Sequence, residues 1–175
     1  MFSISLDVKD VEAQLKVLDH FMADKTDVME DIGNYLVTAI RERIVHGGPA
    51  PDGTPWAPKK AATLARYKAK GEGVDSRTLI HTNHLVQEGI SHDAGPDFVE
   101  VFASPPYAAA MHFGAKRGSF GSYSGTDKRG RAFSGVAPWG DIPARPFLGI
   151  SDDDEREIID LISEGIARQL GAALG

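Results

Sequence analysis

Two prolines near the carboxyl end of the chain constrain its fold more than any other feature. Pro143 and Pro146 lie within a single short segment, Ile142 to Gly149. Proline fixes its own φ, lacks a backbone N–H donor and keeps the residue before it extended. The segment therefore fits neither a helix nor the interior of a sheet. We expect a fixed, extended strap.

A helix start follows the strap directly. Ser151 is suited to cap a helix, and the acidic residues from Asp152 to Glu155 stand where the positive end of the helix dipole favours anions. Apolar residues then recur every three or four positions from Ile158 to Leu170. This pattern predicts an amphipathic helix at the end of the chain.

The first part of the chain predicts one strand and two helices. Residues 2–6 alternate apolar and polar side chains, which is typical of a short strand. Apolar side chains then step by three or four over residues 8–22 and again over residues 28–44. Gly33 interrupts the second stripe at a cost of about 1 kcal/mol relative to alanine, so we expect a neighbouring element to pack closely there.

The middle of the chain begins with a turn-rich loop. Residues 47–58 contain four prolines and three glycines, so regular structure stops there. An exposed indole would leave a large apolar surface in water, which predicts that Trp56 anchors this loop. The basic residues that follow are interleaved with Leu64 and Tyr67 at helical spacing, which predicts a short surface helix that ends at Gly71.

A hairpin and a second short helix follow. A turn signal at residues 94–97 separates two candidate strands between residues 88 and 102. The second strand carries valines on one face and phenylalanines on the other, so we expect both of its faces to be covered, in a sheet or at an interface. Residues 105–114 open with proline and close with glycine, as short helices do, and we expect Tyr107 and Phe113 to pack this helix against the sheet.

Residues 114–141 are rich in glycine and in basic residues, and they have few aliphatic side chains. Such a segment buries too little surface to fold alone, so we expect a mobile basic Gly-rich loop or arm that a partner orders. The expected fold class is therefore α+β. Amino-terminal helices and a terminal helix pack on a small antiparallel sheet, and residues 1–175 form a single domain that carries the arm.

The composition excludes several classes of protein. The chain has no cysteine, which excludes disulfides, thiolate metal sites and thiol nucleophiles. Its amino terminus lacks the pattern of a signal peptide, and no apolar run is long enough to cross a membrane, so we expect a soluble protein. Charge is uneven. Residues 46–150 hold twelve Lys and Arg against nine acids, whereas residues 151–175 hold two against seven. This contrast between a basic middle and an acidic end suits contact between complementary faces of neighbouring copies, although solvated helix faces explain the same pattern.

No motif predicts an enzyme. His81, His84 and His92 lack the spacing of a metal site, because ligands on a helix are usually four residues apart. The three aspartates from Asp152 match no calcium loop, and their place at a helix start explains them. The Ser-Gly pairs of the chain lack the flanking Gly-x-Ser-x-Gly pattern of a nucleophile elbow. We therefore expect no catalytic residue, no metal and no cofactor.

Four motifs, taken in order, resemble the phage virion morphogenesis family, the tail-completion proteins of tailed bacteriophages and prophages. They are Pro51-Asp52-Gly53-Thr54-Pro55-Trp56, Leu79-Ile80-His81-Thr82-Asn83-His84-Leu85, Tyr107-Ala108-Ala109-Ala110-Met111-His112-Phe113-Gly114 and the strap. Asn83 stands where the family usually has glycine, and asparagine also tolerates the left-handed backbone. Met111 and His112 stand where a glutamine often precedes the Phe-Gly pair of the family.

The resemblance implies a structural, non-enzymatic virion protein that is made in the host bacterial cytoplasm. It would act in tail completion and head-tail joining at the neck, in a ring of copies, six being the expected number. Other tail and connector proteins are then its partners, and no membrane is involved. We assign interface roles to a set of residues: Trp56, Tyr107, His112, Phe113, Arg145 and Phe147. Arg145 is expected to pair with an acid of the terminal helix or with a neighbouring copy, so its loss should impair assembly more than folding.

A second hypothesis assigns nucleic-acid contact to the arm. Its cations are Lys116, Arg117, Lys128, Arg129 and Arg131, and Phe120, Tyr123 and Phe133 lie among them. Basic residues interleaved with aromatic residues are what single-strand binders use. Packaged DNA at a neck would allow non-specific contact with phosphates. The same arm would equally serve as a clasp between subunits, which the acidic net charge of the chain favours.

Overall fold

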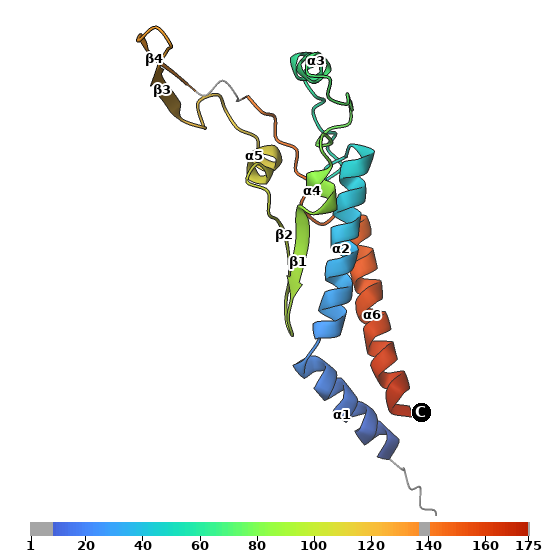
Figure 1. The fold of residues 1–175 in the computed structure, drawn as a ribbon. Helices are drawn as coiled ribbons and strands as arrows, with labels where there is room; N and C mark the ends of the chain where they lie inside the picture. Colours follow the sequence, from blue (N-terminus) through green and yellow to red (C-terminus); the bar gives the residue numbers. More distant parts are fainter. Residues whose placement is uncertain (1–8, 137–140, 175) are drawn as a thin grey trace, which may run out of the picture. The chain divides into compact units, whose positions relative to one another are not determined.

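The computed structural model describes residues 9–136 and 141–174 (Figure 1). The predicted strand at residues 2–6 lies outside the described residues. The helices are α1 (Lys9–Ala23), α2 (Thr26–His46), α3 (Ala61–Ala69), α4 (His84–Gln87), α5 (Ala108–Phe113) and α6 (Asp152–Leu174). The strands are β1 (Ile90–Ala94), β2 (Val99–Ala103), β3 (Ser122–Thr126) and β4 (Ala132–Val136). Within the described residues, β1 pairs with β2 and β3 pairs with β4 in two small antiparallel sheets, which is consistent with the α+β class.

The chain divides into two compact units. Unit 1 comprises Met1–Thr38, His92–Val101 and Asp152–Gly175, and unit 2 comprises Ala39–Ser91 and Phe102–Ser151. The prediction that residues 1–175 form a single domain stays a prediction.

Unit 1 is built on a core of helix stripes. Phe21, Val28, Ile32 and Leu36 are buried, and half-buried side chains of β2 and α6 pack against them. The valine face of β2 contacts this core, so the helices pack on the small sheet as predicted. The opposite face does not match the expectation, because Phe98 is 51% exposed and Phe102 is 40% exposed. The chain itself therefore does not cover both faces, and cover at an interface stays a prediction.

One hydrogen bond and one close packing contact fix α2 against its neighbours in unit 1. The Tyr35 hydroxyl donates a hydrogen bond of 3.0 Å to the buried Asp154 carboxylate at the start of α6, which lies alongside the first half of α2 (Figure 1). Burial, followed by this hydrogen bond and the nearby carboxylates, raises the pKa of Tyr35 to about 12. At Gly33, a Cβ atom would lie 2.2 Å from the His92 ring, which confirms the predicted close packing.

Unit 2 has its own core, which includes Ile44, Ile90 and Phe147, all fully buried. Trp56 is 8% exposed, and its indole donates a hydrogen bond of 3.0 Å to the Pro146 carbonyl. The predicted anchoring of the Pro-rich loop is therefore confirmed, and the anchor is the strap.

The Gly-rich segment contains more regular structure than the sequence predicts. β3 and β4 pair from Ser122 with Val136 to Thr126 with Ala132. Asp127 closes the turn, because its carboxylate accepts hydrogen bonds from the backbone amides of Arg129 and Arg131. The segment therefore includes a β-hairpin, and the expectation of a mobile loop, or of an arm that a partner orders, stays a prediction.

Candidate functional site

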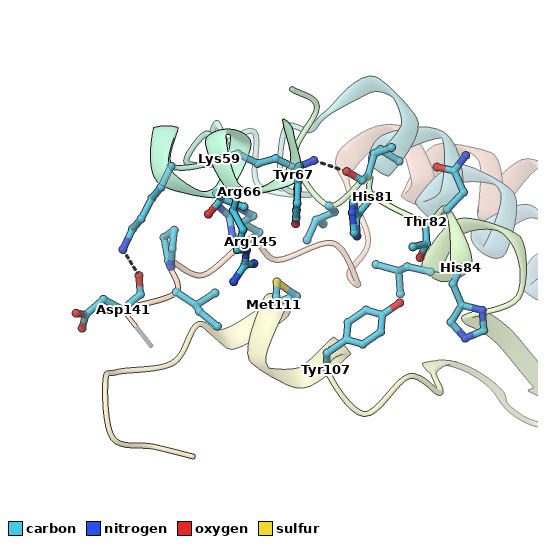
Figure 2. Close-up of a pocket in the computed structure, with 18 residues that line it drawn as sticks. Lys59, Arg66, Tyr67, His81, Thr82, His84, Tyr107, Met111, Asp141 and Arg145 are labelled. Atoms are coloured by element: carbon cyan, nitrogen blue, oxygen red, sulfur yellow. Dashed lines mark hydrogen bonds between the residues drawn. The ribbon is translucent and has the colours of Figure 1, made fainter. Parts of the chain in front are cut away.

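A groove of about 490 Å³ lies within unit 2. Its lining side chains come from four stretches that are far apart in the sequence: residues 59–67, 79–85, 107–111 and 141–145. Figure 2 shows α3, with Arg66 and Tyr67, facing α5, with Tyr107 and Met111. We call this cavity, together with the residues that line it, the groove.

Positive charge dominates the groove. Lys59, Lys60, Arg66 and Arg145 line it, against one carboxylate, that of Asp141. The lysines are held by neutral oxygens: Lys59 donates to the carbonyls of Asp75 and Ile80, and Lys60 donates to the Asp141 carbonyl at 2.8 Å. Carbonyls orient these ammonium groups without neutralising them, so the positive charge remains available.

Lys59 is partly buried at the edge of α3. Burial lowers the pKa of its ammonium below the usual value, and the Arg145 and Arg77 guanidinium groups act in the same direction against the Asp75 carboxylate. Its ammonium lies 5.5 Å from the centre of the Tyr67 ring. The environment therefore disfavours the charged form, and an anion in the groove would stabilise it.

An aromatic stack holds α3 over the groove. The Tyr67 and His81 rings lie 4.1 Å apart and nearly parallel, at 10°. The His81 Nε2 atom lies 3.1 Å from a Glu72 carboxylate oxygen, and the Arg66 guanidinium lies over the Tyr67 ring, 5.8 Å from its centre. These contacts position one wall of the groove, and they leave Arg66 exposed.

The groove also gathers left-handed backbone. Among the described non-glycine residues, positive φ occurs at Leu79 (65°), Asn83 (59°) and Asp141 (48°), and all three line the groove. The value at Asn83 confirms that asparagine adopts the left-handed backbone at its motif position. For leucine such a backbone is costly and persists only where its surroundings impose it, which is common at functional sites.

Arg145 connects the strap to this region through hydrogen bonds to backbone carbonyls. Arg145 is 7% exposed, and its guanidinium donates to the carbonyls of Ala57 at 2.9 Å and Pro58 at 3.2 Å. Its backbone amide donates to the Met111 carbonyl of α5 at 3.0 Å. Within the described residues, carbonyl oxygens take the place of the expected acid of the terminal helix, and pairing of Arg145 with a neighbouring copy stays a prediction.

His112 fastens the strap to α5. Its Nδ1 atom accepts hydrogen bonds from the backbone amides of Phe147 at 3.3 Å and Leu148 at 3.5 Å, so the neutral ring carries its proton on Nε2. Its ring also meets the Phe147 ring edge to face at 5.2 Å. Burial lowers the pKa of His112, which agrees with a neutral acceptor at this position.

The structure separates the residues that the sequence grouped as an interface. Trp56, Arg145 and Phe147 lie in the interior of unit 2. Phe113 is 77% exposed and Tyr107 is 40% exposed. The expectation that Phe113 packs α5 against the sheet was therefore wrong, and Tyr107 lines the groove instead. The interface roles of all six residues stay predictions.

The five cations of the predicted arm are all exposed: Lys116, Arg117, Lys128, Arg129 and Arg131. Arg131 forms an ion pair with Asp127 at 3.0 Å, which closes the turn of the hairpin. Phe120, Tyr123 and Phe133 beside them are 43%, 50% and 47% exposed. The hairpin thus presents cations together with aromatic rings.

Each histidine of the candidate metal set has a carboxylate neighbour. His81 contacts Glu72, His84 lies 3.5 Å from Glu88, and His92 lies 2.9 Å from Glu30. Over residues 9–136 and 141–174, no group of three or more His, Cys, Asp or Glu side chains is placed to hold a metal ion. No helix in that part of the chain is both long enough and apolar enough to span a membrane.

Sequence reasoning missed the groove as a site. It singled out Arg145 and Tyr107 for other roles, and it described the cations of α3 only as a basic surface helix. The available signal was the motif at residues 79–85, whose left-handed Asn83 lines the groove.

Comparison with known proteins gives one match. The sequence model of the phage virion morphogenesis family matches residues 6–167. No curated protein and no solved structure matches the chain.

Proposed function

Because this chain belongs to the phage virion morphogenesis family, we propose that it is a structural subunit of a tailed-phage virion, acting in tail completion and head-tail joining at the neck. In this proposal the subunits form a ring, expected to hold six copies, and the ring contacts other tail and connector proteins. The role is mechanical and not enzymatic.

Exposed apolar side chains carry this proposal. Phe113 is 77% exposed, Met22 and Ile159 are each 62% exposed, and Leu15 is 59% exposed. Large apolar groups in water favour association when they gather in patches, and Leu15 and Met22 lie seven residues apart, on one side of α1. A subunit that works within an assembly would cover such surfaces.

The first test is the solution mass of the purified protein by light scattering, over a concentration series and at two salt concentrations. A defined oligomer of ring size supports the proposal and leads to negative-stain imaging with tail components. A monomer at every concentration removes self-assembly from the proposal.

The joining role needs a separate test in an infected cell. A phage that lacks this gene should accumulate filled heads and unattached tails, and the wild-type gene supplied in trans should restore joining. Normal virions without the gene would overturn the proposal.

The β3–β4 hairpin supports a second candidate role, contact with DNA phosphates. Its exposed cations and aromatic rings are the groups that bind nucleic acid without sequence readout. Affinity for DNA should then fall steeply as salt rises. Absence of binding at low salt would leave contact with protein as the role of the hairpin.

A further inference from the structure

We propose that the groove receives the acidic start of helix α6 from a second copy of this chain, with Ile159 seated in the groove. This inference rests on the proposed assembly role and specifies the contact that builds the assembly. It follows from charge, shape and exposure on two surfaces of the chain.

The first surface is the groove. It combines cations that have no carboxylate partner with an apolar lining. Lys60 is held by a carbonyl, Arg66 lies on the Tyr67 ring, and neither forms an ion pair within the described residues. Apolar side chains such as Met111 and Ile142 line the space between the cations. An occupant that matches this surface has an apolar centre and carboxylates around it.

The second surface lies on α6 in unit 1. Ile159 is 62% exposed there, although other apolar residues of the helix pack against the core. Asp152 and Glu155 are exposed seven and four residues before Ile159, on its face of the helix, and the exposed Asp160 follows it about 100° around the helix axis. Arg156, three residues before Ile159, is paired with Asp153. None of the carboxylates of Asp152, Glu155 and Asp160 has an ion-pair partner in the described part of the chain. We call these three residues and Ile159 the acidic knob.

The two surfaces complement each other. The groove presents four cations against one carboxylate, and the knob presents two carboxylates on the face of its isoleucine and a third beside that face. The groove volume of about 490 Å³ is ample for an isoleucine side chain and the groups beside it. Desolvated carboxylates would meet guanidinium and ammonium groups that carbonyls already orient, which reduces the cost of ordering them.

The symmetry of the contact agrees with a ring. Groove and knob are different surfaces, so each copy offers both, and the contact is head to tail. A head-to-tail contact closes into a ring when the rotation between neighbours divides a full turn. Leu79, Asn83 and Asp141 have positive φ, which their surroundings must impose, so two stretches of the groove wall are already shaped before the partner arrives.

Cross-linking tests the contact directly, because the chain has no cysteine of its own. Two single-cysteine variants, Ile159→Cys and Thr63→Cys, are mixed and treated with a short bismaleimide. Thr63 lines the groove from α3. We expect mixed dimers from this pair. The control pair uses Lys68→Cys, an exposed position of α3 that does not line the groove, with Ile159→Cys. Equal yields from both pairs would overturn the proposal.

Charge reversal gives a second, independent readout. K60E/R66E in the Thr63→Cys partner should reduce the mixed-dimer yield about tenfold, because each reversal places like charges together. E155K/D160K in the Ile159→Cys partner should restore the yield with that reversed groove. Lys68→Glu and Glu164→Lys are the matched controls outside the two surfaces, and both should leave the yield unchanged. Failure of the compensating pair to restore cross-linking would count against the contact.

The outcomes separate this contact from the wider proposal. A wild-type oligomer whose mass is unaffected by K60E/R66E, with no selective cross-link, overturns the contact and retains the assembly role. A monomer with no cross-link overturns both. Loss of duplex-DNA binding in K60E/R66E, with no selective cross-link, assigns the groove to phosphate and overturns the contact.

Discussion

The partners of Arg145 change the role expected for that residue. Its guanidinium lies inside unit 2 and bonds the carbonyls of Ala57 and Pro58. Removing it would leave buried acceptors without donors, a loss of about 2 kcal/mol. We therefore expect Arg145→Ala to lower the free energy of unfolding by about that amount in urea titrations, and Arg145→Lys to lower it less. An unchanged unfolding midpoint with impaired assembly would instead favour the surface contact predicted from sequence.

His112 makes unit 2 sensitive to acid. Burial lowers the pKa of His112, so the unfolded chain binds this proton more readily than the folded one. The stability that the neutral His112 ring contributes is fully present above the pKa of the unfolded chain, about 6.5. It is lost as pH falls through the lower pKa of the folded state. Between about pH 7.5 and about pH 5, wild-type stability in urea should fall more than that of His112→Gln.

The matched control for His112 is His20→Gln, at an exposed position of α1. This variant should follow the wild-type pH curve. If His112→Gln followed it as well, protonation of His112 would not be what loosens the strap.

At the scale of elements, the contact of α2 with β1 depends on a missing side chain. A Cβ at position 33 would lie within 2.8 Å of three atoms of the His92 ring, so the whole ring would have to move and its contact with Glu30 would break. Alanine favours a helix by about 1 kcal/mol over glycine, but overpacking costs about 1 to 3 kcal/mol. We expect Gly33→Ala to lower the thermal midpoint.

Two further variants distinguish packing from helix propensity. Gly171 in α6 has no atom within 4 Å of a built Cβ, so Gly171→Ala should raise the midpoint or leave it unchanged. The double variant G33A/H92A should be less destabilised than the sum of its single changes. Strict additivity would mean that the His92 ring is not the obstacle.

At the scale of the whole molecule, α2 and the β1–β2 hairpin contribute residues to both units. A continuous helix is expected to couple the folding of the two units, so unfolding should occur in a single step. In a Trp139→Phe background, Trp56 fluorescence reports on unit 2, while far-ultraviolet circular dichroism reports mainly on the helices. The two urea curves should coincide. Separate midpoints would show that residues 1–175 do not form one cooperative domain.

The sequence predicts the elements of this fold better than its sites, for physical reasons. Helices α1, α2 and α6 follow from local apolar periodicity, and the strap follows from its prolines. The β3–β4 hairpin was missed because its glycines obscure the alternating pattern of a strand. The turn between the two strands is closed by hydrogen bonds to the Asp127 carboxylate. The groove was missed because its walls come from four distant stretches, and no local pattern predicts that Tyr67 stacks on His81.

The strap is held mainly by its own main chain, and this has an evolutionary consequence. The carbonyl of Pro146 accepts from Trp56, and the carbonyls of Phe147 and Gly149 accept from Arg43. A bond to a backbone oxygen survives replacement of the side chain at that position. Mutations can therefore accumulate at Ala144 or Leu148 without breaking these hydrogen bonds. Distant relatives with few identical residues in the strap can therefore keep the same hydrogen bonds between the strap and its neighbours.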